Sequence, residues 1–103
     1  MKISENFNCQ VIKLESELLI SLQGNLDMYT TSILQETIWR YLEPSITKIT
    51  IDCGWVQYVD SSFLQLLTRL STLVDKVRII NASRTVRRIF TITSLDKTFI
   101  EDD

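Results

Sequence analysis

The sequence predicts an α/β domain, with a small mixed sheet of four to five strands and three to four helices packed mainly on one face. Residues 49–53 alternate between apolar and polar side chains, which is typical of a half-buried strand. Residues 63–74 repeat apolar side chains at spacings of three and four, which is typical of a helix on a core. Strands and helices alternate along the chain, and such crossovers place neighbouring strands parallel.

Composition favours one soluble globular domain over residues 1–103. The chain is 45% hydrophobic and 23% charged, with two glycines and one proline, so a linker or a disordered tract is not expected. The net charge is −2 and no basic stripe stands out, which argues against nucleic acid as a partner. No apolar run reaches about 18 residues and the N-terminus lacks a signal-peptide core, so we expect no membrane span and a cytoplasmic location.

The first half of the chain predicts two strands, a helix and a third strand. Residues 7–14 and 17–23 are expected to form an antiparallel hairpin, because the gap between them is short. A helix over residues 30–43 follows, with Thr30 or Thr31 as its cap and Pro44 as its stop. Its expected apolar face consists of Leu34, Ile38, Tyr41 and Leu42. The alternating segment is the third strand.

The second half predicts two further helices around a strand. A helix is expected from Ser61 or Ser62 to Asp75, followed by a strand over residues 77–82 and a helix over residues 85–93. Residues 95–103 are expected to close the domain, as a short edge strand. Cys9 and Cys53 both lie on the apolar side of a strand pattern, outside any CxxC motif, and are expected to be buried free thiols.

The stretch VDSSFLQLL at residues 59–67 carries the candidate functional residues. Catalysis by Ser61 or Ser62 would need a general base, but the chain has no histidine and no GxSxG or SxxK motif. No carboxylate cluster has metal-ligand spacing and no glycine-rich phosphate loop is present, so no enzyme activity, metal or cofactor is expected. One interpretation is that Asp60 or Ser61 only caps the helix.

The alternative interpretation is a phosphorylation switch. A helix N-terminus presents unpaired N–H groups and the positive end of the helix dipole, so it tolerates a phosphate on a first-turn serine. That phosphate adds nearly two negative charges, which disrupt a docked protein without unfolding the domain.

Four stretches together resemble the STAS domain family of the anti-sigma factor antagonist type. They are GNLD at 24–27 with Thr30 after it, ITIDCGWVQYVDSSFLQLL at 49–67, VRIINAS at 77–83 and VRRIFTITSLDKTFI at 86–100. The resemblance implies a regulatory protein that binds an anti-sigma factor, which is a serine kinase of the histidine-kinase-like ATPase class. A serine phosphatase would reverse the modification.

The resemblance also implies roles for individual residues. Ser62 resembles the phosphoacceptor, with Ser61 as second choice and Asp60 as the carboxylate before it. The implied partner-binding residues are Asn25, Asp27, Thr30, Asp60, Ser61, Ser62, Phe63, Ser83 and Arg84.

One residue departs from the family pattern, which usually has glycine where this chain has Phe63. Phe63 is expected either to join the core or to stand exposed as an apolar contact. The alternative function is therefore a non-catalytic subunit of a larger assembly, either a stressosome-type scaffold or a cytoplasmic transporter subunit. Nucleotide or lipid binding at the same end of the sheet is a third class.

Overall fold

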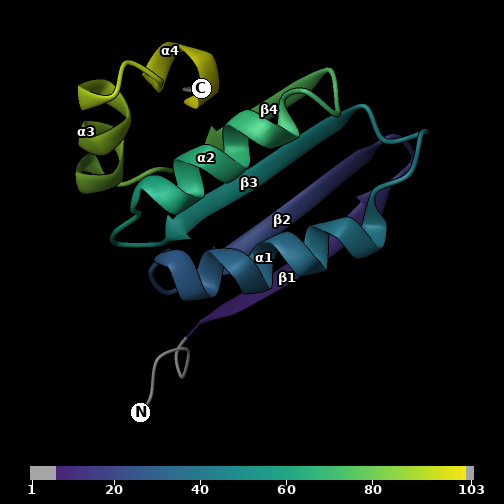
Figure 1. The fold of residues 1–103 in the computed structure, drawn as a ribbon, viewed down its shortest axis with the longest axis horizontal. Coiled ribbons are helices and arrows are strands. Elements are labelled where there is room, and N and C mark those ends of the chain that lie inside the picture. Colours follow the sequence, from purple (N-terminus) through teal and green to yellow (C-terminus); the bar gives the residue numbers. More distant parts are fainter. Residues whose placement is uncertain (1–6, 102–103) are drawn as a thin grey trace.

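A four-stranded mixed sheet forms one layer of the domain in a computed structural model that describes residues 7–101 (Figure 1). The strands lie in chain order across the sheet. They are β1 (Asn8–Leu14), β2 (Glu17–Gln23), β3 (Lys48–Trp55) and β4 (Lys76–Ile80). The pair β1–β2 is antiparallel, whereas β2–β3 and β3–β4 are parallel. The predicted fold class, including the hairpin, is confirmed.

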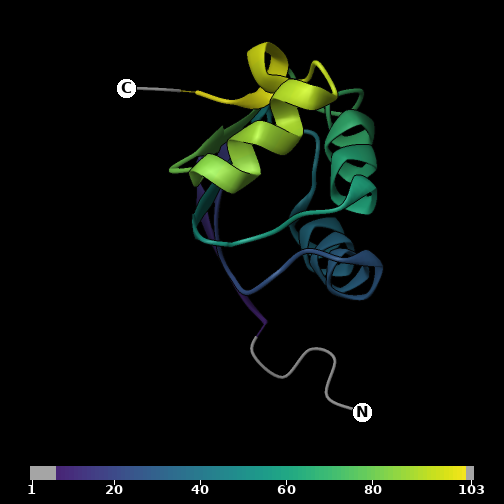
Figure 2. The same cartoon turned by 90° about the vertical axis from the view of Figure 1, so that its left-hand side faces the viewer.

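Two helices cover one face of this sheet and two more lie beyond its β4 edge (Figures 1 and 2). The helices are α1 (Met28–Tyr41), α2 (Ser61–Leu70), α3 (Arg84–Ile92) and α4 (Asp96–Phe99). The first two lie side by side on the covered face, and a hydrogen bond of 2.7 Å from the Arg69 guanidinium to the Gln35 side chain joins them. Within residues 7–101, no helix covers the other face of the sheet.

The core lies between the sheet and α1 and α2, as the alternating pattern predicts. The inward side chains of β2 and β3 are buried: Leu18, Ile20, Leu22, Ile49, Ile51 and Cys53. Phe63 of α2 is completely buried among them, so it joins the core rather than standing exposed. Burying a side chain of this size contributes about 2 kcal/mol, and Phe63 therefore fixes α2 to the sheet.

The two cysteines are free thiols in different surroundings. Cys53 is fully buried, and its burial, with a smaller effect of the neighbouring Asp52 charge, raises the pKa of the thiol to about 12. Cys9 is only half-buried, with its sulfur 3.7 Å from the Thr37 hydroxyl. The prediction of buried thiols thus holds fully for Cys53 and partly for Cys9.

Helix α1 begins two residues earlier than expected, because Asp27 rather than Thr30 or Thr31 is its cap. The Asp27 carboxylate accepts the Thr30 backbone N–H at 2.9 Å, and the Thr30 hydroxyl accepts the Asp27 N–H at 3.0 Å. This reciprocal capping box satisfies two N–H groups that a helix start leaves unpaired. This capping box, chiefly through the hydrogen bond from the Thr30 N–H, holds the pKa of Asp27 below its ordinary value. Tyr41, expected on the apolar face, is exposed.

Two expectations in the second half were wrong. Helix α2 ends at Leu70 instead of Asp75, because the next residues form tighter turns in which Thr72 and Leu73 donate to carbonyls three residues back. Where an edge strand was expected over residues 95–103, Asp96–Phe99 form the short helix α4, and the strand-like contact within the described part of this segment is a single bridge between Ile79 and Ile100. Residues 102–103 lie outside the described residues. The Phe99 ring packs edge-on to the Phe90 ring, with 6.4 Å between the ring centroids, and this contact positions α4 beside α3.

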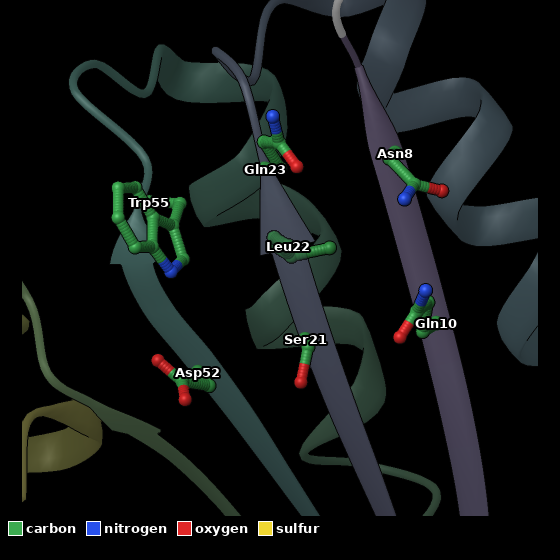
Figure 3. A pocket seen from close by; sticks show the side chains of 7 residues that line it. All are labelled: Asn8, Gln10, Ser21, Leu22, Gln23, Asp52 and Trp55. Carbon is green, nitrogen blue, oxygen red and sulfur yellow. The ribbon is translucent and has the colours of Figure 1, made fainter.

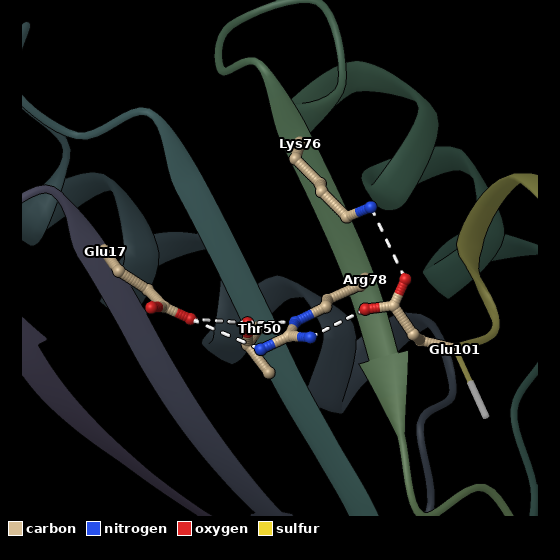
Figure 4. Close-up of polar contacts among 5 residues, drawn as sticks. All are labelled: Glu17, Thr50, Lys76, Arg78 and Glu101. Carbon is tan, nitrogen blue, oxygen red and sulfur yellow. Dashed lines mark hydrogen bonds and ion pairs between the residues drawn. The ribbon is translucent and has the colours of Figure 1, made fainter. Parts of the chain in front are cut away.

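A charged network crosses the uncovered face of the sheet (Figure 4). The Arg78 guanidinium donates to the Thr50 hydroxyl at 2.8 Å and to the Glu101 carboxylate at 2.6 Å. Thr50 in turn donates to Glu17 at 2.6 Å, and the Lys76 ammonium lies 3.4 Å from Glu101. The network joins β2, β3 and β4 to the end of the described chain.

Replacing Asp27 tests the capping box. Asp27→Ala is expected to lower the free energy of unfolding by about 1 kcal/mol at neutral pH. Because the pKa of Asp27 is lowered by folding, its stabilisation is complete above the ordinary value of about 4 and is lost as pH falls through the folded value. Urea unfolding followed by circular dichroism should therefore show the difference from wild type shrinking as pH is lowered below about 4.

Asp27→Asn is the matched control, because asparagine keeps a capping oxygen without the charge. It is expected to lose less stability than Asp27→Ala. An alanine variant as stable as wild type at neutral pH would contradict the role of the cap.

Cys53 is expected to resist alkylation in the folded protein, because the thiolate is the reactive form and a pKa of about 12 leaves almost none at neutral pH. Treatment with N-ethylmaleimide, followed by intact-mass measurement, should add one label at Cys9 and a second only in denaturant. In Cys9→Ser the native protein should stay unlabelled. Rapid native labelling of that variant would show that Cys53 is accessible.

Candidate functional site

Three helices begin at the same end of the sheet, where the parallel strands β2, β3 and β4 end (Figure 1). The loops 24–27 and 56–60 run beside each other there. Two backbone hydrogen bonds join them, Leu26 N–H to Tyr58 O at 3.0 Å and Asp60 N–H to Leu26 O at 2.9 Å, and Gly24 N–H also donates at 3.0 Å to the carbonyl of Trp55 at the end of β3. Leu26 and Val59 are also buried. The two loops therefore form one fixed unit.

Asp60 caps α2 and fixes the two serines that follow it. Its carboxylate accepts the Ser62 backbone N–H at 2.8 Å, and its carbonyl accepts the Phe63 N–H at 3.1 Å. The side chain of Ser61 is exposed, that of Ser62 is half-buried, and that of Phe63 is buried. Both hydroxyls thus lie on the first turn of α2, while the third residue anchors the turn to the core.

The sequence also predicted partner-binding residues that the structure places differently. Asn25 is exposed and Asp27 half-buried, but Thr30 is only 2% exposed and its hydroxyl donates to the Asn25 carbonyl at 2.7 Å. The buried side chains of Thr30 and Phe63 do not reach the surface, so both support the site from beneath instead of forming its contact surface.

Ser83 and Arg84 lie at the start of α3, where the Ser83 hydroxyl caps the helix by accepting the Val86 N–H at 3.2 Å. It is the other end of α3, at Thr93, that lies beside Ser61 and Leu64. Nine helical residues separate these ends by about 13 Å. Ser83 and Arg84 therefore lie at the end of α3 opposite the one beside Ser61, although α3 begins at the same end of the sheet as α2.

Large exposed apolar side chains surround the two loops, and none of them is among the residues predicted to bind a partner. Met28 and Tyr29 follow the Asp27 cap, Tyr58 lies in the second loop, and Trp55 is 79% exposed at the end of β3. Their signal in the sequence was position: each is an apolar residue at a strand end, within a loop or in a first helical turn, outside the core pattern. Exposed apolar groups gathered at one end of a domain are typical of an interaction surface.

Two hollows flank this end. An apolar groove of about 300 Å³ lies between α2 and the end of α3, beside Ser61; it is lined by Ser61, Leu64, Gln65, Thr68, Thr93 and Leu95. The other, of about 260 Å³, opens on the uncovered face next to Trp55 (Figure 3). It is lined by Asn8, Gln10, Ser21, Leu22, Gln23, Asp52 and Trp55, and contains a carboxylate but no cationic side chain. This lining does not favour a phosphate-bearing ligand.

The serines have no catalytic partner among residues 7–101. The Asp60 carboxylate already accepts a backbone N–H, and the chain has no histidine to act as a base. The described residues hold no cluster of three potential metal ligands, and none of their helices has the length and hydrophobicity to cross a membrane. What the arrangement offers is a pair of accessible hydroxyls on a rigid surface.

Comparisons with known proteins agree with this geometry. The model of the STAS domain family matches residues 8–102. The anti-sigma-F factor antagonist RsfB of Mycobacterium tuberculosis is 27% identical over 84 residues, which cover 79% of this chain and 69% of RsfB.

Solved structures show the same fold. An anti-sigma factor antagonist from Mycobacterium paratuberculosis aligns with a TM-score of 0.81 at 23% identity, over 96% of this chain and 88% of that one. The anti-sigma factor antagonist SpoIIAA in its unphosphorylated form aligns with a TM-score of 0.78 at 20% identity, over 94% of this chain and 87% of that one. The phosphorylated Bacillus SpoIIAA aligns with a TM-score of 0.69 at 20% identity, over 94% and 90%. Since the family model spans nearly the entire sequence, this chain belongs to the STAS domain family.

Proposed function

We propose that this protein is an anti-sigma factor antagonist whose binding to its partner is controlled by phosphorylation of Ser62. The partner would be an anti-sigma factor that is a serine kinase of the histidine-kinase-like ATPase class, and a serine phosphatase would reset the switch. Loop 24–27 and the first turn of α2 would contact that kinase. The carrying observation is the pair of hydroxyls on the first turn of α2, above the buried Phe63.

The surroundings of Ser62 support a modification that leaves the fold intact. Its backbone N–H is already bound by Asp60, and its side chain lies at the positive end of the α2 dipole. A phosphate there replaces no core contact. The relatives named as antagonists, and the phosphorylated form of SpoIIAA, are consistent with the same regulation here.

The neighbours of Ser62 explain how a phosphate would release a partner. A phosphoserine carries close to two negative charges, and the Asp60 carboxylate adds another within two residues. The adjoining surface is apolar, because Leu64 and Leu95 line the groove beside Ser61. A partner that covers this surface would have to desolvate the phosphate, so docking is weakened.

Phosphorylation is tested by isolating the tagged protein from its source cells and mapping phosphate by mass spectrometry. We expect phosphate on Ser62, retained in Ser61→Ala and absent in Ser62→Ala. Absence from both serines in cells that contain the partner kinase would contradict the proposal.

Release is tested with Ser62→Asp against Ser62→Asn, a pair that differs by the charge. Asp is expected to reduce capture of the ATPase partner from source-cell extract at least about tenfold, or about 1.4 kcal/mol, while Asn and Ala still capture it. Thermal unfolding should show all three variants folded. A large, nucleotide-independent complex that binds Asp and Asn equally would instead favour the assembly-subunit alternative.

A further inference from the structure

The two edges of the sheet differ in how they are covered. At the β4 edge, Ile100 forms a bridge with Ile79, and the Glu101 N–H donates to the Ile79 carbonyl at 2.9 Å. At the opposite edge, β1 is the terminal strand, and no other strand within residues 7–101 pairs with its outer side. Because antiparallel strands direct alternate backbone groups to either side, β1 presents unpaired N–H and C=O groups along this edge.

β1 lacks the features that normally prevent association at an edge strand. Such edges are usually shortened, bulged, interrupted by proline or charged. β1 instead pairs with β2 over seven residues in an unbroken register and contains no proline. Its one charged residue, Lys13, forms an ion pair with Glu43 after α1. The β1 edge is therefore long and regular, and the charge of its lysine is largely neutralised by Glu43.

Apolar side chains of α1 flank the same edge. Thr37 marks the β1 side of α1, since its hydroxyl lies 3.7 Å from the Cys9 sulfur. Ile33 and Tyr41 precede and follow Thr37 by four residues, so they lie on this flank, and each is 39% exposed. Beneath them, Cys9 and Val11 of β1 are only half-buried. An apolar strip thus runs along the free edge.

We propose that β1 is the interface of a homodimer, in which it pairs antiparallel with β1 of a second copy across a two-fold axis. A free strand edge is complementary to an extended strand, and this chain supplies one with the same flanking apolar strip. A two-fold axis near Gln10 or Val11 makes the strip self-complementary. It also separates the two Lys13 residues by about 14–20 Å along the strands, beyond the screening length of physiological salt, whereas parallel pairing would place them side by side.

The size of the edge sets the strength of this dimer. Seven strand residues extend about 24 Å, and one strand with one helix flank gives a strip on the order of 15 Å wide. Such a contact falls in the small class of weak, reversible interfaces. We therefore expect a dissociation constant of tens to hundreds of micromolar, roughly 5–6 kcal/mol of binding free energy.

Sedimentation velocity of the full chain, from about 5 to about 500 µM, tests the dimer. Wild type should change from monomer to dimer over this range. Ile33→Glu should raise the dissociation constant at least about tenfold, because it buries a charge at the interface. Trp39→Glu is the matched control: Trp39 is 42% exposed on the same helix, but it lies four residues from Gln35 and therefore on the flank toward α2. Trp39→Glu should leave the dissociation constant of the dimer unchanged.

Hydrogen exchange tests the pairing of the strands independently of any variant. Amides of residues 8–14 should become more protected at about 500 µM than at about 5 µM, while those of α2 should not change. A monomer at every concentration, equal effects of the two glutamate variants, or a dimer without added protection of β1 would each overturn the proposal. Because Ser62 lies on α2 across the sheet from this edge, Ser62→Asp should dimerise like wild type, so the dimer and the phosphorylation switch can fail separately.

Discussion

The backbone pairing between loops 24–27 and 56–60 is the constraint on which the rest of the site depends. Parallel pairing of β2 with β3 brings both loops to one end of the sheet, and two hydrogen bonds of 2.9 and 3.0 Å then fix them to each other. Asp27 and Asp60 each end one of these loops and cap the helix that follows. A change in one loop would therefore displace the starts of both α1 and α2, and with them the whole candidate surface.

Helical geometry explains why three consecutive residues of α2 differ so much in exposure. Ser61, Ser62 and Phe63 are exposed, half-buried and buried in turn, because successive helical residues point about 100° apart. The buried Phe63 holds the turn against the core. The accessible hydroxyls are thus presented by a rigid turn, and a regulatory charge placed on them would act on a docked protein rather than on the fold.

Most of the fold was predictable from periodicity, whereas helix boundaries and the terminal helix were not. Alternation in β2 and β3 identifies strands because each has one buried face. Thr30 was mistaken for a cap because the sequence does not show that Asp27 can reach its N–H. Residues 95–103 were expected to form an edge strand, because local sequence preference does not reveal the packing of Phe99 against Phe90 that accompanies helix α4. The exposure of Trp55 and Tyr29 was likewise not predictable, because it depends on where loops 24–27 and 56–60 begin and end in the folded chain.

The candidate surface and the β1 edge are separated by the sheet itself, which has a consequence for regulation. A partner at the first turn of α2 approaches the end of the sheet where the parallel strands finish, while a second copy at β1 approaches from its side (Figure 1). The two contacts share no described residue, so each protomer of a dimer keeps its own serines accessible. If the partner is itself dimeric, two weak contacts would act together through effective concentration. Release would then depend steeply on modifying both protomers, because a single phosphate would leave one contact intact.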